Sequence, residues 1–186
     1  TGDSVSLSFN NCMTGSGTLT GSLGFHIDSL AGTYGNAPYS VGVSMTFGSL
    51  ALSSTAYSAS LLGSITVAGS KTGANAFTQS ISTTSLGASA TYGGVTRSRS
   101  LTSFTASETR TADATYTYLS NYSLAGTLAS SGFTGTQAVS FTTPTTIVRR
   151  GTDMYPYTGV LLISGASNSA LRLTVISNSQ VRQDLD

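Results

Sequence analysis

Apolar and polar residues alternate along much of the chain, which is the pattern of β-strands that bury one face. Over residues 17–30 the positions between Thr, Ser, His and Asp are taken by Leu19, Leu23, Phe25 and Ile27. Because successive side chains of a strand point to opposite faces, this spacing collects the apolar side chains on one side. Val41, Val43, Met45 and Phe47 repeat the pattern. Both stretches are predicted to be strands.

The alternation changes phase once in the second of these strands. After Gly48 the apolar positions become Leu50 and Leu52, one residue out of step with Phe47. A β-bulge absorbs such an extra residue and bends the strand. We therefore expect a bulge at Gly48 in a sheet that curves.

Further strand patterns follow, separated by turn signals rich in Gly, Asn and Ser. They are marked by Ala59, Leu61, Ile65 and Val67, by Tyr116, Tyr118 and Tyr122, and by Leu171, Leu173 and Val175, which we expect to pair with residues 160–163 around a turn at 165–169. Residues 83–111 fit either long solvated strands or mobile loops. Pro144 and Pro156 predict an irregular crossing or an edge, because Pro cannot donate to a strand ladder.

Helical spacing of apolar residues is absent, and the strong helix formers Glu, Lys and Gln are rare. The chain is thus predicted to be all-β and nearly without helix, with antiparallel strands arranged as a meander, a sandwich or an open or half barrel. Its 186 residues suit one domain covering 1–186. Because no signal peptide pattern opens the chain, we expect it to be mature or trimmed.

Charged residues make up only 8% of the chain, against about 25% in an ordinary domain. The net charge is +1 and the cations are scattered, which argues against the clustered cations of a nucleic-acid interface. The pair Arg149 and Arg150 is expected in a solvated turn. The sequence contains no run of about 20 apolar residues, so no transmembrane helix is predicted. Scarce Lys and Glu beside abundant Ser and Thr suit a secreted or surface-exposed protein.

Cys12 is the one cysteine of the sequence, so no internal disulfide and no cysteine metal site can form. Two interpretations remain. Cys12 is either a small buried apolar residue or half of a disulfide with a cysteine outside this segment, as occurs in oxidising compartments.

Several stretches resemble a poorly characterised group of secreted or lipid-anchored β-rich envelope proteins of Gram-negative bacteria. They are the opening 5–12 (VSLSFNNC) with 19–23, the middle segment 118–126, and the closing 159–166 (GVLLISGA) with 171–175 (LRLTV) and 180–182. The resemblance implies an envelope or extracellular location and transfers no catalytic residue. Members of the group usually carry another cysteine upstream of the position of Cys12, which this chain lacks.

Candidate chemistry is sparse. His26 and Asp28 fall on one strand face, where a Ser or Thr of a neighbouring strand would complete a triad, yet hydroxyls are so common here that one beside any His is expected by chance. Glu108 and Asp113 are the nearest candidates for a carboxylate pair, but Arg110 between them favours a solvated ion-pair loop. Asp184 and Asp186 are too few for a calcium site. We assign no catalytic, cofactor or metal residue.

Two further features bear on binding. Tyr155 and Tyr157 flank Pro156 and form a candidate surface for a ligand or partner, such as a glycan. Asn121 opens an N-glycosylation motif, which is a weak signal in a chain so rich in Ser and Thr.

The sequence therefore predicts a non-enzymatic structural or adhesive protein of the bacterial cell surface. Monomeric β-proteins guard their sheet edges with Lys and other charges, and this chain contains a single Lys. Unguarded edges favour a homopolymer, an extracellular filament joined by β-strand complementation. The alternative is an envelope carrier of a lipid or other apolar ligand in a curved sheet whose cavity is lined by Leu23, Phe25, Val43, Phe47 and Leu61.

Overall fold

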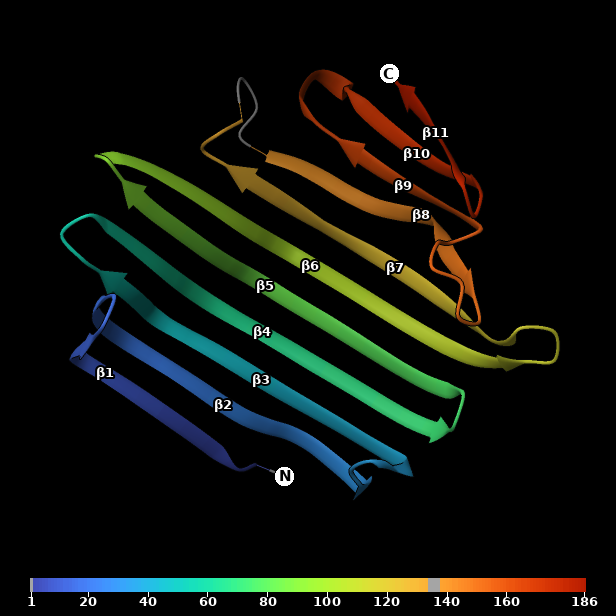
Figure 1. The fold of residues 1–186 in the computed structure, drawn as a ribbon, viewed down its shortest axis with the longest axis horizontal. Coiled ribbons are helices and arrows are strands. Elements are labelled where there is room, and N and C mark those ends of the chain that lie inside the picture. The colour runs from blue at the N-terminus through green and yellow to red at the C-terminus, as the bar shows by residue number, and fades with distance from the viewer. Residues whose placement is uncertain (1, 134–137) are drawn as a thin grey trace.

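The computed structural model describes residues 2–133 and 138–186, which form eleven strands in one antiparallel sheet (Figure 1). Each strand pairs with its neighbours in the sequence. The strands are β1 (Ser4–Thr14), β2 (Gly17–Thr33), β3 (Asn36–Ser53), β4 (Tyr57–Gly73), β5 (Ala76–Tyr92), β6 (Val95–Asp113), β7 (Thr117–Ser130), β8 (Ala138–Arg150), β9 (Thr158–Ser164), β10 (Ala170–Ser177) and β11 (Gln180–Leu185).

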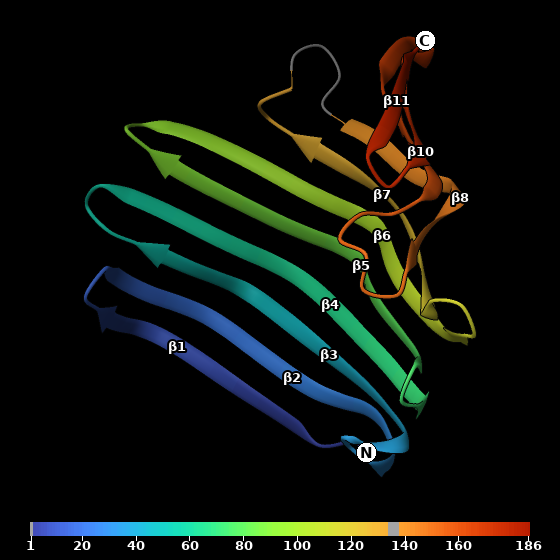
Figure 2. The ribbon, with the colours of Figure 1, turned by 45° about the vertical axis from the view of Figure 1, so that its right-hand side comes forward.

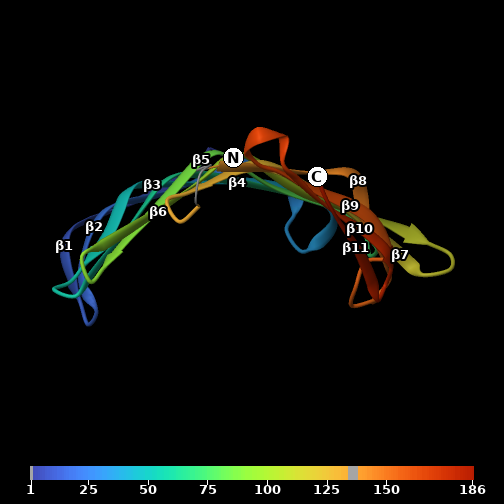
Figure 3. The ribbon, with the colours of Figure 1, turned by 90° about the horizontal axis from the view of Figure 1, so that it is seen from above.

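The all-β prediction is confirmed, and of the arrangements it left open the structure has the open meander. The strand order β1 to β11 is unbroken, and β1 and β11 are the two edges of the sheet. The sheet bows into an arch when seen from above (Figure 3). Strands β9 to β11 are turned relative to the long strands before them (Figure 2). Within the described residues the one helical element is a short 3-10 turn, Ala166–Asn168.

The strand register sorts the side chains into two faces. One row of paired residues crosses the sheet through Leu7, Leu23, Phe47, Gly63, Leu86, Leu101, Leu128 and Val139. A row on the other side reads Ser4, His26, Ser44, Thr66, Ser82 and Thr105. We call these the apolar face and the hydroxyl face. The alternation in the sequence produces both, since neighbouring strands keep matching residues side by side.

The apolar face is the concave one. The turn between β2 and β3 lies on the inner side of the arch (Figure 3). Its Tyr34 lines a hollow together with Tyr39 and Val41, which belong to the apolar face. The residues expected to line a carrier cavity, from Leu23 to Leu61, share this face.

The bulge expected at Gly48 is confirmed. The register between β3 and β4 shifts between Phe47 and Leu50, and Ser49 has a φ of 51°. Across from it, Gly21 has a φ of 100°, and a side chain there would meet the Ser49 carbonyl. Similar register shifts recur in β1, β5, β6 and β8. Because each bulge adds local bend and twist, this series curves the sheet.

The bounds and neighbours of the later strands answer the remaining predictions about strands and edges. Residues 83–111 are long strands, not loops, since they form most of β5 and β6. The hairpin of β9 and β10 pairs Leu171 with Ile163, as expected, and β11 extends the sheet beyond it. Tyr116 was wrongly placed in a strand, because β7 begins after it. Pro144 lies in β8 where pairing to β7 is interrupted, and since β8 pairs on both sides it is not an edge.

A one-layer sheet leaves little enclosed core. The accessible surface is 11221 Å², whereas a compact monomer of this mass exposes about 8,300 Å². Among the described residues Val160, at 6% exposure, is the one buried apolar side chain. The concave apolar face is thus largely open to solvent.

No helix in the described ranges has the length and apolar character needed to cross a membrane.

Candidate functional site

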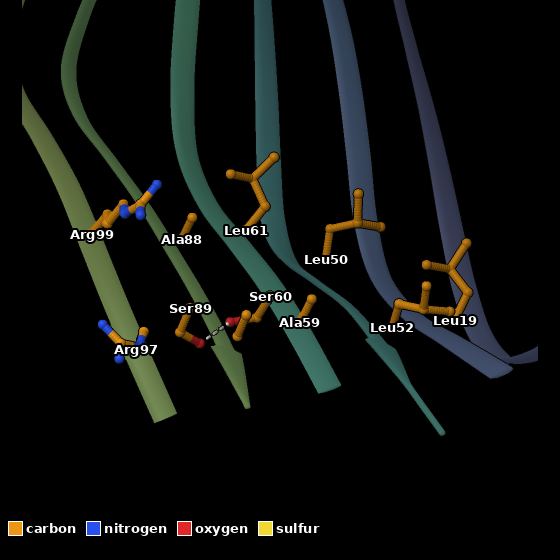
Figure 4. A pocket seen from close by; sticks show the side chains of 11 residues that line it. Leu19, Leu50, Leu52, Ala59, Ser60, Leu61, Ala88, Ser89, Arg97 and Arg99 are labelled. Carbon is orange, nitrogen blue, oxygen red and sulfur yellow. Dashed lines mark hydrogen bonds between the residues drawn. The ribbon is translucent and has the colours of Figure 1, made fainter. Parts of the chain in front are cut away.

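The apolar face holds a trough of about 580 Å³ that crosses β2 to β6 near one end of the strands. At one end stand the half-buried leucines of β2, β3 and β4, and at the other end two arginines of β6 (Figure 4). Small side chains of β4 and β5 lie between them. The lining side chains on this face are Leu19, Leu50, Leu52, Leu61, Ala59, Ala88, Ala90, Arg97 and Arg99. We call this feature the leucine–arginine trough.

Arg97 and Arg99 stand on the same face because they are two residues apart in β6. Register pairs Arg97 with Ala90 and Arg99 with Ala88. Among the described residues three ion pairs form, and neither arginine takes part in them. The two guanidinium groups are therefore free to bind an anion at the end of an apolar surface. These two cations are therefore not scattered, and their spacing of two along a strand is a signal that the sequence contains.

The two edges of the sheet are a second candidate interface. β1 offers eleven residues, Ser4–Thr14, with no charged residue and no proline. Its side chains are mostly exposed, with Val5 at 59% and Leu7 at 46%. β11 is shorter and carries an ion pair between Arg182 and Asp184 at 3.0 Å. The β1 edge thus lacks the charges and the proline that block strand pairing, and its one such device is the bulge between Phe9 and Cys12.

Cys12 lies on this β1 edge, and its thiol is free and exposed. The interpretation of Cys12 as a buried apolar residue is therefore wrong. An edge strand has a neighbour on one side only, which leaves Cys12 open to solvent. A disulfide with a cysteine outside this segment stays a prediction.

The two tyrosines of the candidate binding surface, Tyr155 and Tyr157, lie in different environments. Tyr155 is 60% exposed, whereas the Tyr157 ring stacks on Arg150 with 3.5 Å between the ring centroid and Cζ. Arg150 also lies 4.7 Å from the Tyr116 ring, and both arginines of the pair end β8 in half-buried positions. The solvated turn expected for Arg149 and Arg150 is wrong, because aromatic rings of the neighbouring loops cover the guanidinium group of Arg150. Tyr155 alone of the two remains exposed for a partner.

A polar cluster interrupts the apolar face in β5 to β7. The Glu108 carboxylate is buried at 8% exposure and accepts hydrogen bonds from Gln79 Nε2 at 2.8 Å and the Tyr122 hydroxyl at 3.1 Å. Arg110 Nη2 lies 3.4 Å from it. The ion pair expected between Glu108 and Arg110 is confirmed, but the solvated loop is wrong, because this part of the chain is a central strand with neighbours on both sides.

The same cluster fixes Arg110 between two rings. Its Cζ lies 4.4 Å from the Phe77 ring of β5 and 4.2 Å from the Tyr118 ring of β7. Its Nε donates to the hydroxyl of Ser120, which is fully buried. Every described bond of this guanidinium is internal, so the cluster is suited to holding three strands together rather than to reacting with a substrate.

Glu108 and Asp113 do not form a hydrolytic pair. Five residues of extended β6 separate their Cα atoms by about 17 Å, and an odd spacing puts the two side chains on opposite faces. Glycoside hydrolysis needs carboxyl groups about 5–10 Å apart. Asp113 instead accepts the backbone N–H groups of Thr115 and Tyr116 at 2.8 and 2.9 Å and so closes the turn.

The structure does bring a serine to His26. Ser4 Oγ lies 2.8 Å from His26 Nδ1, His26 Nε2 lies 3.8 Å from Asp28, and Ser44 Oγ donates to Asp28 at 2.6 Å. The His26 side chain is 45% exposed on the hydroxyl face. Catalytic stabilisation of a charged intermediate requires a water-excluded setting, which this open surface does not provide. The cluster joins β1, β2 and β3 through side chains.

Comparison with known proteins finds no matching family model, no similar curated protein and no similar solved structure.

Proposed function

We propose that the protein is a non-enzymatic structural or adhesive component of the bacterial cell surface that assembles with its own copies by β-strand addition. The observation that carries the proposal is the β1 edge. It is long and uncharged, and its outward backbone groups have no strand partner among the described residues. Main-chain hydrogen bonds to an added strand would satisfy those groups.

An open polymer requires that the two different edges of the sheet, β1 and β11, pair with each other. Pairing of β1 with β1 of another copy would be isologous and would stop at a dimer. Pairing of β1 with β11 of the next copy is heterologous and continues into a filament. Repulsion between these two edges should be small, because β1 is uncharged and Arg182 and Asp184 of β11 pair with each other at 3.0 Å. An extracellular filament would follow.

The test is electron microscopy of native material beside a sizing column on the same sample. Regular fibres are expected, and discrete particles with the mass of one chain at high concentration would overturn the proposal. A double variant, Ser6→Lys with Ser8→Lys, puts two charges on the β1 edge and should abolish the fibres. Both serines are exposed on the hydroxyl face.

The matched control is Ser80→Lys, which adds a charge to the same face within β5, a strand paired on both sides. It should leave the fibres intact. Equal loss of fibres in the edge variant and this control would show that charge on the hydroxyl face, and not strand addition at β1, decides assembly.

A second candidate function is an envelope carrier of an apolar ligand. The specific observation in its favour is the concave apolar face with its trough of about 580 Å³, a volume in the range of small-molecule sites. Native mass spectrometry of material purified without detergent tests it. A co-purifying acyl mass is expected from a carrier, and repeated preparations without any added mass would count against it.

A further inference from the structure

We propose that the leucine–arginine trough binds a single-chain anionic amphiphile, a long-chain fatty carboxylate, with its acyl chain over the leucines and its carboxylate at Arg97 and Arg99. The inference rests on the second of the two functions proposed above and specifies its ligand. It holds whether or not the sheet also polymerises.

The shape and polarity of the trough fit an extended acyl chain. The trough runs across the strands from Leu19 on β2 to Arg97 on β6, a path of four strand spacings or about 19 Å. The side away from the arginines is bordered by Leu50, Leu52 and Leu61 (Figure 4). Between the leucines and the arginines, the small side chains of alanines in β4 and β5 line the floor of the trough. A long hydrocarbon chain matches this length and covers leucine surface that water otherwise wets.

The charge of the trough selects the headgroup. Arg97 and Arg99 are about 7 Å apart along β6 and face the same side, so both guanidinium groups can reach one carboxylate. The described acidic residues form their ion pairs elsewhere, at His26, Arg110 and Arg182. A neutral lipid would leave this pair of cations unused, and a second copy of the chain would bring the same two cations against its partner.

The first experiment measures the affinity of the purified wild-type protein for dodecanoate, tetradecanoate and hexadecanoate by calorimetry, below the concentration at which each forms micelles. A chain lying half-buried in an open trough should gain about fourfold in affinity for each two added methylenes. Hexadecanol, which lacks the charge, should bind about tenfold more weakly than hexadecanoate.

Paired variants locate the site. Arg97→Gln with Arg99→Gln should weaken hexadecanoate binding about tenfold and leave hexadecanol binding unchanged. Arg172→Gln, an exposed arginine of β10, is the control for net charge. Leu61→Gln should weaken both ligands, whereas Leu62→Gln, the adjacent residue on the hydroxyl face at 57% exposure, should weaken neither. Urea unfolding confirms that each variant is folded.

The outcomes separate this proposal from the function on which it rests. Equal binding of hexadecanoate and hexadecanol would keep an apolar carrier and overturn the role of the arginines. No binding of either ligand to a monomeric preparation would overturn both. Binding to anionic phospholipid vesicles without binding to dissolved hexadecanoate would assign the trough to a membrane surface. Protection of the trough leucines from solvent in a lipid-free protein dimer would assign the trough to a second copy.

Discussion

The stability of the sheet should depend strongly on Arg110, which the structure clamps between strands. The informative change is Arg110→Met, because methionine keeps an unbranched apolar stem between the Phe77 and Tyr118 rings and removes the charge. It also leaves the buried Glu108 carboxylate without its cationic neighbour at 3.4 Å.

The expected cost follows from these contacts. Removing one partner of a buried ion pair costs about 3–5 kcal/mol. Gln79 and Tyr122 still donate to the Glu108 carboxylate, which favours the lower end of that range. Loss of the cation–π contacts to two rings adds about 1 kcal/mol, since the Arg110 side chain is 22% exposed. We expect the free energy of unfolding to fall by about 4 kcal/mol.

Urea unfolding followed by circular dichroism measures this loss. With a slope of about 2 kcal/mol per molar urea, the midpoint should fall by about 2 M. Arg172→Met, on the exposed face of β10, is the control and should change the free energy of unfolding by less than about 0.5 kcal/mol. The double variant Arg110→Met with Glu108→Gln should recover part of the loss, because no buried carboxylate is then left alone. A loss below about 1 kcal/mol for Arg110→Met, or no recovery in the double variant, would refute the reasoning.

Three further predictions concern packing and exposure. Gly126→Ala should destabilise the protein by about 1–3 kcal/mol in urea unfolding, because its Cβ would lie 3.0 Å from the Phe141 ring, whereas Gly24→Ala meets nothing closer than 3.8 Å and should be nearly neutral; equal effects would contradict this. Ser49→Gly should stabilise it by about 1 kcal/mol, since Ser49 has a φ of 51°, and a loss of stability would argue against strain at the bulge. The reduced Cys12 thiol should react with a maleimide without denaturant, and protection in a monomer would contradict its exposure.

The sequence by itself determined several of the strands, their faces and one bulge. These features are local, because period-two alternation sets which side chains share a face and Gly-rich segments set the turns. The phase change after Gly48 even located a bulge. The same local information could not place Arg149 and Arg150, since their surroundings come from the rings of Tyr116 and Tyr157 in two loops.

Only the tertiary structure decided which strands lie side by side and whether the sheet closes. Register across several strands brings Leu19 of β2 and Arg97 of β6 into one trough, although they are 78 positions apart in the sequence. It likewise places Phe77 and Tyr118 against Arg110 and buries Glu108, for which the nearby Arg110 in the sequence predicted a solvated loop. Each bulge shifts every later pairing by one residue, so contacts between distant strands follow from the accumulated geometry of the sheet and not from any short stretch of sequence.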